Sequence, residues 1–241
     1  MWRALSNDSG PPLFYLLEKP FVAAAGSLGP ADNAARLLPF LALLLLLAGA
    51  RSLPRGAPRR RFLLLAASSP FLLLYSAEAR AYAVVALLGF VLFLLAVRDV
   101  PGFRRIAAIA LLTALVLWTH YLAIFLVASL LVVTLVQRRR GAAIGIGVGA
   151  ALFLPWLPAM LAQPEAALSW MREREPDSAI GFLAALGGGM RVPSSLSRPL
   201  PEPLFWLACA VGIALLVSIL ALRPSQPRAR AGRAVVLLTL G

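Results

Sequence analysis

Cysteine and histidine are almost absent from this sequence, which holds one of each, Cys209 and His120. A single cysteine excludes an internal disulfide framework. The two side chains are also too few for a structural zinc site, which takes about four thiolate or imidazole ligands. We therefore expect no resident metal or cofactor, although the phosphate of a substrate could carry a divalent cation.

Charged residues are scarce as well, at 14% of the chain, and acidic ones are the rarest, with 10 against 23 basic residues. Hydrophobic residues make up 61%, and the mean hydropathy is +0.85. A soluble domain of this length does not reach such values. The composition predicts an all-α, polytopic integral membrane protein.

Apolar runs separated by short polar or basic stretches recur along the chain. Several are shorter than the ~20 residues that an upright transmembrane helix needs, so we expect short hairpins among them. We expect about seven or eight transmembrane helices in all. The runs cover residues 37–50, 62–76, 80–97, 106–118, 121–136, 142–162, 204–222 and 234–241.

Arginine clusters lie between the apolar runs, and such clusters are typical of cytoplasmic loops. To keep the flanking clusters on one side, the stretch 62–97 must turn near Ala77 and the stretch 106–137 must turn at residues 118–121. Both turns then face outward from the plasma (inner) membrane. The clusters are Arg51/Arg55/Arg59/Arg60/Arg61, Arg98/Arg104/Arg105, Arg138/Arg139/Arg140 and Arg223/Arg228/Arg230/Arg233.

The same topology divides the chain along its length. Residues 1–35 form a first external loop, 36–162 a transmembrane helical bundle, 163–203 an external loop and 204–241 the C-terminal transmembrane helices. Nine of the ten acidic residues then lie outside. Because the basic residues are spread over short loops, we expect membrane lipids as partners and no nucleic acid.

The beginning and the end of the chain predict a fragment. No cleavable signal peptide is visible, the chain begins in an external segment, and it ends inside an apolar run. We expect a further helix upstream.

Glycines in the stretch 142–162 and just before it follow a regular spacing. Gly141, Gly145 and Gly149 recur at every fourth residue. Small residues at this spacing let transmembrane helices approach closely, so we expect a helix-packing face.

Glu78 and Arg80 interrupt an otherwise uncharged stretch that runs from Phe62 to Val97. A charge at bilayer depth costs roughly 2.5 to 3.5 kcal/mol, so such residues persist where they line a polar cavity, find a partner or reach an interface. The pair is therefore either a functional site or a device that caps and solvates a tight turn.

Four short strings with the same predicted sidedness follow one another along residues 7–190. The first is Asn7–Leu17 (NDSGPPLFYLL), followed by Ala35-Arg36-Leu37-Leu38-Pro39. The others are Ser69–Tyr82 (SPFLLLYSAEARAY), Thr119-His120-Tyr121, and Leu154–Pro158 (LPWLP) with Gln163 and Trp170 after it. Their order resembles that of membrane glycosyltransferases of the GT-C class, in the family 39 or protein mannosyltransferase-like group.

Two departures from that family's pattern stand out. The family's catalytic acid typically precedes the Pro-Pro-Leu string, in a segment that would lie upstream of Met1. Ala77 also replaces the glutamine of the family's Tyr-Ser-Gln-Glu-Ala-Arg string. Within this chain Asp8 is the available candidate for the catalytic base.

The resemblance implies an enzyme that transfers a sugar, a mannose-like hexose or a pentose, from a polyprenyl-phosphate donor. The acceptor would be a protein, lipid or glycan on the outer membrane face. One carboxylate must act as general base on the attacking hydroxyl, and cations must stabilise the departing phosphate. The implied donor-binding residues are Glu78, Arg80, Tyr82, Arg36, His120 and Tyr121, with Gln163 and Trp170 in the acceptor loop.

Other interpretations remain open for the same residues. His120, Tyr121 and Arg36 could be polar anchors at the membrane interface. A transporter or lipid flippase would also place a few charges between helices, although it predicts internal repeats, and none is convincing here. A truncated, inactive membrane scaffold would fit the missing acidic motif.

Overall fold

The computed structural model describes residues 10–25, 31–98, 102–162, 206 and 210, and the structural statements below concern these residues. Every regular element among them is a helix, and no strand occurs in this part of the chain. The all-α prediction is confirmed. The helices predicted at 204–222 and 234–241 fall, apart from two isolated positions, outside the described residues.

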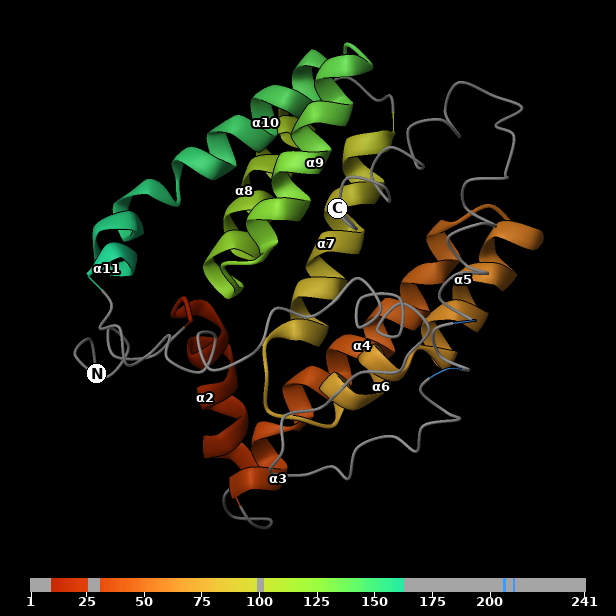
Figure 1. Ribbon diagram of the computed structural model, residues 1–241, viewed down its shortest axis with the longest axis vertical. Coiled ribbons are helices and arrows are strands. Elements are labelled where there is room, and N and C mark those ends of the chain that lie inside the picture. The colour runs from red at the N-terminus through yellow and green to blue at the C-terminus, as the bar shows by residue number, and fades with distance from the viewer. Residues whose placement is uncertain (1–9, 26–30, 99–101, 163–205, 207–209, 211–241) are drawn as a thin grey trace.

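The first predicted external loop contains two helices, α2 (Leu13–Ala25) and α3 (Ala31–Ala35). Two buried prolines, Pro11 and Pro12, lead into α2. They set the start of the helix because a proline in front of the first turn gives up no helical hydrogen bond. Phe14 on α2 is 3% exposed and joins a buried cluster with side chains of the bundle helices. This segment, predicted to be external, is therefore packed against the bundle (Figure 1).

Helix α4 (Leu37–Gly49) matches the predicted apolar run 37–50 and continues into a short 3-10 turn, η1 (Ala50–Ser52). It ends there because Leu53 is extended ahead of Pro54, as a residue before proline tends to be.

The run 62–76 is two helices and not the single one that the hydrophobic pattern predicts. Helix α5 (Ala57–Ser68) ends at Ser69, and α6 (Pro70–Ser76) begins directly after it. The Ser69 hydroxyl accepts a hydrogen bond from the Leu72 backbone N–H (3.3 Å). A serine cap followed by proline at the first helical position starts a new helix and stops the previous one.

Both predicted helical turns are confirmed. Residues 77–81 join α6 to α7 (Tyr82–Val97), and residues 120–122 join α8 (Phe103–Thr119) to α9 (Ala123–Val136). The run 142–162 begins as α10 (Arg140–Ala151), then breaks into a 3-10 turn, η2 (Leu154–Trp156), and α11 (Leu157–Leu161). Two prolines, Pro155 and Pro158, explain this break.

The glycines of α10 form the predicted packing face, which lies on α8. A β-carbon at Gly149 would stand 2.3 Å from the Ala110 carbonyl oxygen, and one at Gly145 would stand 2.9 Å from that of Ile106. Gly147, on the other side of α10, has open space. The two backbones therefore touch along this seam, and glycine is the residue that permits such an approach.

Two helical segments are long and apolar enough to cross a membrane, Asn33–Ser52 and Arg140–Leu161. Only 33% and 22% of their apolar windows are buried within the fold. Helices α7 and α9 are apolar but shorter, with 16 and 14 residues. Exposed apolar faces of this kind suit contact with lipid.

The helix ends gather into two groups of opposite character. At one end, which we call the arginine end, the last carbonyls of α7 accept hydrogen bonds from neighbouring arginines. Arg105 binds Leu95 O, Arg139 binds Val97 O, and Arg98 binds Ser52 O after α4. At the opposite end, the aromatic end, rings from several helices meet: Phe71, Tyr75, Tyr82, Trp118, His120, Tyr121, Phe153 and Trp156.

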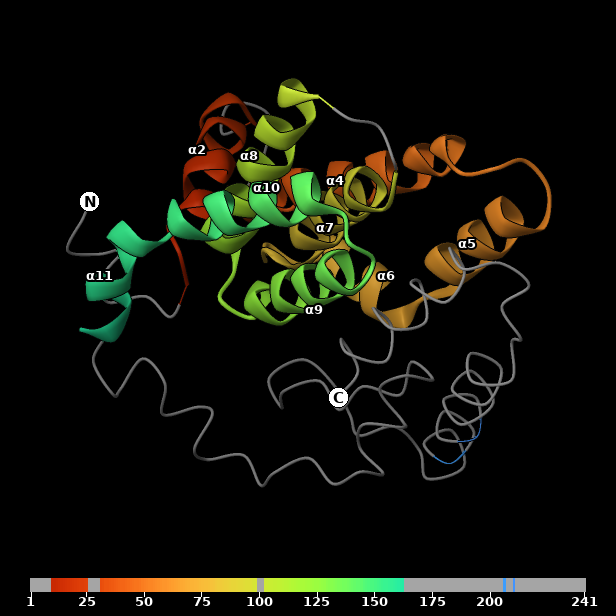
Figure 2. The same cartoon turned by 90° about the horizontal axis from the view of Figure 1, so that it is seen from above.

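Figure 2, seen from above, shows α7, α8, α9 and α10 close together and α5 displaced to one side of them. The connections alternate between the two ends, as the arginine clusters predict: α7 leads to the arginine end, α8 returns, α9 leads back and α10 returns again.

Candidate functional site

The aromatic end contains a row of rings that crosses three segments of the chain. Tyr75 on α6 lies 4.3 Å from Tyr82 at the start of α7, and Tyr82 lies 4.8 Å from His120, between ring centroids. Phe71, one turn before Tyr75 on α6, packs edge-on against both tyrosines. The i, i+4 spacing of Phe71 and Tyr75 puts both rings on the same face of α6.

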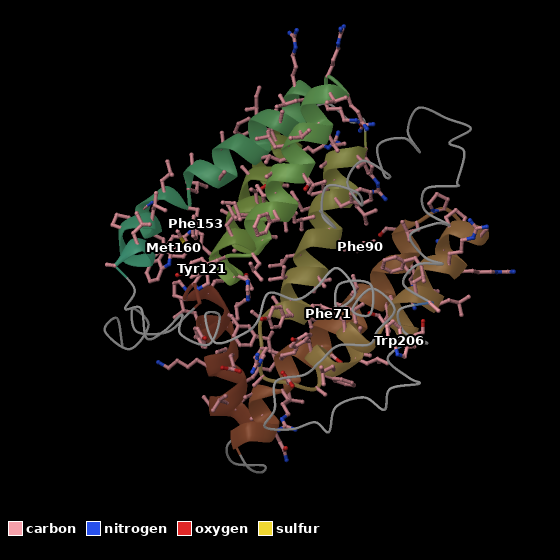
Figure 3. All side chains as sticks on the ribbon, viewed as in Figure 1. Phe71, Phe90, Tyr121, Phe153, Met160 and Trp206 are labelled. Atoms are coloured by element: carbon pink, nitrogen blue, oxygen red, sulfur yellow. The ribbon has the colours of Figure 1, made fainter. Side chains whose placement is uncertain are left out.

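A second group of rings joins the turn after α8 to the end of α10. The Trp156 indole Nε1–H donates a hydrogen bond to the Tyr121 hydroxyl (3.0 Å), and the Trp118 ring lies 5.6 Å from that of Trp156. Phe153 completes the group, 6.3 Å from Tyr121, and the two rings lie near each other in Figure 3. Trp156 is 5% exposed, so its ring is packed inside the fold.

Four strings that lie far apart in the sequence thus meet at the aromatic end. Phe14 of the first string shares a buried cluster with Ala83 and Val84, directly after the second. Tyr82 of the second string contacts His120 of the third. Tyr121 of the third binds Trp156 of the fourth.

Glu78 and Arg80 form an ion pair in the turn before α7. The Arg80 Nε lies 3.2 Å from the Glu78 Oε2, and their side chains are 54% and 22% exposed, respectively. The Arg80 N–H also donates to the Glu78 carbonyl (2.8 Å), which holds the turn tight. An exposed pair two residues apart adds little stability and ties no two helices together. It does orient the guanidinium.

The start of α7 has no side-chain cap. Its N-cap residue, Ala81, lies between Arg80 and the first helical residue, Tyr82, and has no side-chain acceptor. The free N–H groups and the dipole of a helix N-terminus attract anions. The alternative prediction, that Glu78 and Arg80 cap this helix, finds no side-chain hydrogen bond to support it.

His120 is held in one tautomer. Its Nδ1 accepts a hydrogen bond from the Leu122 N–H (3.1 Å), so in the neutral ring the proton is on Nε2. Burial lowers the pKa of His120 from 6.5, which favours the neutral ring. At neutral pH it is therefore a hydrogen-bond donor and not a cation.

One carboxylate on α2 was not among the residues predicted from the sequence. Glu18 follows Phe14 by one turn on α2, and its Oε1 is buried with no hydrogen-bond partner. Burial raises the pKa of Glu18 above 4.5. The available sequence signal was the i, i+4 spacing of Phe14 and Glu18 in the helix that follows Pro12. This spacing places both side chains on one helix face.

The remaining predicted site residues are less closely grouped or fall outside the described residues. Arg36 is exposed and directly precedes α4. Leu38 on that helix packs against the Phe14 cluster. Within the described ranges, no hydrogen bond or ion pair joins Arg36 to the Glu78–Arg80 pair. Asp8, Gln163 and Trp170 lie outside those ranges.

The site offers an exposed guanidinium, a carboxylate that orients it, an uncapped helix start and a neutral imidazole beside tyrosine rings. These groups suit a phosphate and an adjoining polar ring better than a metal ion. Among the described residues, no three histidine, cysteine or acidic side chains gather closely enough to hold one. Comparison of the chain with protein-family models, curated proteins and solved structures found no match.

Proposed function

We propose that this chain is a membrane glycosyltransferase similar to the GT-C class. It transfers a sugar from a polyprenyl-phosphate donor to an acceptor on the outer face of the membrane. The proposal rests on the resemblance of four strings to that class. The observation that carries it is the chain of contacts that joins them at the aromatic end, where one of them contains the Glu78–Arg80 ion pair.

Convergence supports the proposal for a physical reason. Strings that match a pattern by chance have no cause to meet in space. Strings that contribute to one site must meet, because a reacting group is positioned by several segments of the chain at once.

Arg80 binds the donor phosphate in this proposal. Negative charge grows on the phosphate as the glycosidic bond breaks, and a guanidinium presents paired donors to it. The uncapped N-terminus of α7 adds its N–H groups and dipole on the same side. Glu78 orients Arg80, and the Tyr82 and His120 rings border the sugar.

The proposal includes the membrane arrangement. The chain crosses the plasma membrane several times, with about seven or eight spans. The arginine end faces the cytoplasm, and the aromatic end faces outward. Tyrosine and tryptophan rings are favoured at the interface between membrane and water. Asp8 as the base, Arg36 as a second phosphate contact, and Gln163 and Trp170 in the acceptor loop stay predictions within it.

Transfer of radiolabelled sugar tests the proposal. Membranes containing the expressed protein receive polyprenyl-phosphate-linked sugars, and label in lipid, protein and glycan fractions is measured. Arg80→Ala should lower transfer on the order of a hundredfold, since it removes charge stabilisation at the leaving group. Glu78→Gln keeps the shape of the side chain and should lower it less, because Arg80 stays in place.

Arg60→Ala is the matched control. Arg60 is an exposed arginine near the start of α5 and is not one of the residues that form the aromatic end. Its loss should therefore leave transfer unchanged. Donor-independent label, or equal transfer by Arg80→Ala and wild-type protein present in equal amounts, would overturn the proposed role of Arg80. No transfer from any donor by inserted, folded protein would remove the glycosyltransferase proposal itself.

A further inference from the structure

The arginines of the arginine end divide into two kinds. Arg105 and Arg139 are partly buried and donate to the carbonyl oxygens that end α7. Their sequence neighbours Arg104, Arg138 and Arg140 are exposed, and their side chains form no hydrogen bond or ion pair with the described residues. The first kind closes a helix end. The second kind places three positive charges on the protein surface.

These three arginines belong to one surface. The start of α10 packs against the start of α8, where a β-carbon at Gly141 would contact the Ile106 side chain at 3.5 Å. Arg105 and Arg139 bind carbonyls that are two residues apart on α7. Figure 3 shows nitrogen-tipped side chains that extend beyond the ribbon at this end of α9 and α10.

Arg138 occupies a backbone position that arginine disfavours. Its φ is +56°, and it is the only non-glycine residue with positive φ in the described ranges. The Arg138 N–H donates to Leu135 O and the Arg139 N–H to Thr134 O, which is the hydrogen-bond pattern of a Schellman motif at the end of α9. Glycine is the usual residue at this position because it has no β-carbon to strain.

No acidic side chain offsets these charges in the described part of the chain. The described acidic residues whose side chains are placed are Glu18 on α2 and Glu78 in the turn before α7, and neither contacts an arginine of the arginine end. A cluster of like charges raises the free energy of the fold unless a counter-ion neutralises it. An arginine in a strained position that adds to such a cluster indicates selection for binding rather than for stability.

Exposed apolar side chains identify the kind of anion. Phe103, next to Arg104, is 83% exposed, and Val136, two residues before Arg138, is 78% exposed. A soluble phosphate ion has no apolar part that could contact these side chains. A phospholipid presents an anionic headgroup and acyl chains side by side, and it satisfies both kinds of side chain.

We infer that Arg104, Arg138 and Arg140, with Phe103 and Val136, form a binding site for an anionic phospholipid at the arginine end. The headgroup phosphate is held between the guanidinium groups, and the acyl chains lie along the exposed apolar faces of α8 and α9. This site lies at the opposite end of the bundle from the aromatic end and does not depend on the proposed transferase activity.

A lipid titration tests the site. The full chain in neutral detergent receives phosphatidylglycerol or phosphatidylcholine with a fluorescent acyl chain, and fluorescence anisotropy gives the affinity. Phosphatidylglycerol should bind more tightly. Each arginine near the surface contributes about fivefold, so Arg104→Gln/Arg138→Gln/Arg140→Gln should weaken binding on the order of a hundredfold.

Arg55→Gln/Arg60→Gln/Arg61→Gln is the matched control, because it removes the same charge from exposed positions around α5. It should change the affinity by about twofold at most. Equal weakening by both triple variants would overturn the site in favour of diffuse attraction. So would equal affinity for the two lipids, or displacement of phosphatidylglycerol by millimolar inorganic phosphate.

Arg138→Gly separates lipid binding from folding. Glycine relieves the positive φ, so the midpoint of thermal unfolding without lipid should rise by about 3 °C. Phosphatidylglycerol affinity should fall about fivefold in the same protein. A variant that is more stable and binds the lipid as tightly as wild type would remove Arg138 from the site.

Discussion

Arg105 and Arg80 lie near opposite ends of the same helix, α7, and they bind very different partners. Arg105 reaches from α8 to a carbonyl of α7, so its charge joins two helices. Arg80 pairs with Glu78, two residues away in the same turn, and joins nothing distant in the chain. The partly buried arginines of the arginine end, Arg105 and Arg139, donate hydrogen bonds to carbonyl groups at the end of α7. The one ion pair among the described residues leaves a guanidinium exposed beside an uncapped helix start.

This difference separates charges that hold the fold from charges that are available to a ligand. A side chain that satisfies a distant carbonyl contributes to stability, and that bond fixes the position of its guanidinium within the fold. A side chain oriented by a sequence neighbour is arranged at little cost in stability and remains accessible. Burial and partner distance therefore discriminate between the two kinds more clearly than residue type does.

The largest expected effect comes from disrupting the packing face between α8 and α10. Gly149→Ala would place a β-carbon against the Ala110 carbonyl oxygen and should destabilise the fold by about 3 kcal/mol, because backbone cannot move aside cheaply. Gly147→Ala meets open space and should stabilise slightly through helix propensity. Thermal unfolding in detergent measures both, and equal midpoints for the two variants would contradict the seam.

Removing a closing arginine sharpens the comparison at the arginine end. Arg139→Gln loses charged hydrogen bonds to the end of α7 and should cost about 2 kcal/mol. Arg61→Gln removes an exposed arginine and should stay within about 0.5 kcal/mol of wild type. Denaturant unfolding in neutral detergent decides, and a similar loss in both would mean that the arginine end is held by charge in general.

His120 gives the aromatic end a pH dependence of its own. Because its pKa is lowered in the fold, the unfolded chain binds a proton near pH 6.5 that the folded chain does not. Stability should therefore fall as pH decreases from 7 through the folded pKa. His120→Asn retains an acceptor for the Leu122 N–H, so this part of the acid sensitivity should disappear in melting profiles from pH 7 to 5.

Glu18 should produce the smallest effect and one of opposite sign. Its pKa is raised in the fold, so the ionised carboxylate costs stability at pH 7, and protonation removes that cost. Glu18→Gln should stabilise by less than about 1 kcal/mol at pH 7, since the group is partly exposed. The gain should vanish below pH 4.5, and a gain that persists there would assign it to packing and not to charge.

Much of the helical layout could be predicted from the sequence. The arginine clusters correctly required turns near Ala77 and His120, because a topology that keeps like clusters together leaves few alternatives. The glycine spacing correctly predicted a packing face, since the distance between helix backbones follows directly from side-chain size.

Other features depend on tertiary structure that the hydrophobic pattern does not encode. The run 62–76 was wrongly predicted as one helix, because hydropathy is blind to a Ser-Pro pair that caps a new start. The sequence indicated Glu78 and Arg80 as a pair, and the resemblance grouped them with Tyr82 and His120. The contact between Tyr82 and His120 depends on how α7 and α8 pack, and the burial of Glu18 depends on how α2 lies against its neighbours.

The shortness of α7 has a consequence for the bilayer around the protein. Its 16 residues rise about 24 Å, whereas the hydrocarbon core of a typical membrane is ~30 Å thick. In the membrane arrangement that we propose, a bundle built around such a helix would draw both leaflets inward, so the bilayer would thin near the protein. The Glu78–Arg80 turn would then lie deeper than the surrounding headgroups. On the proposed function, the phosphate of a long isoprenoid would leave the surface plane and meet Arg80 in this local depression.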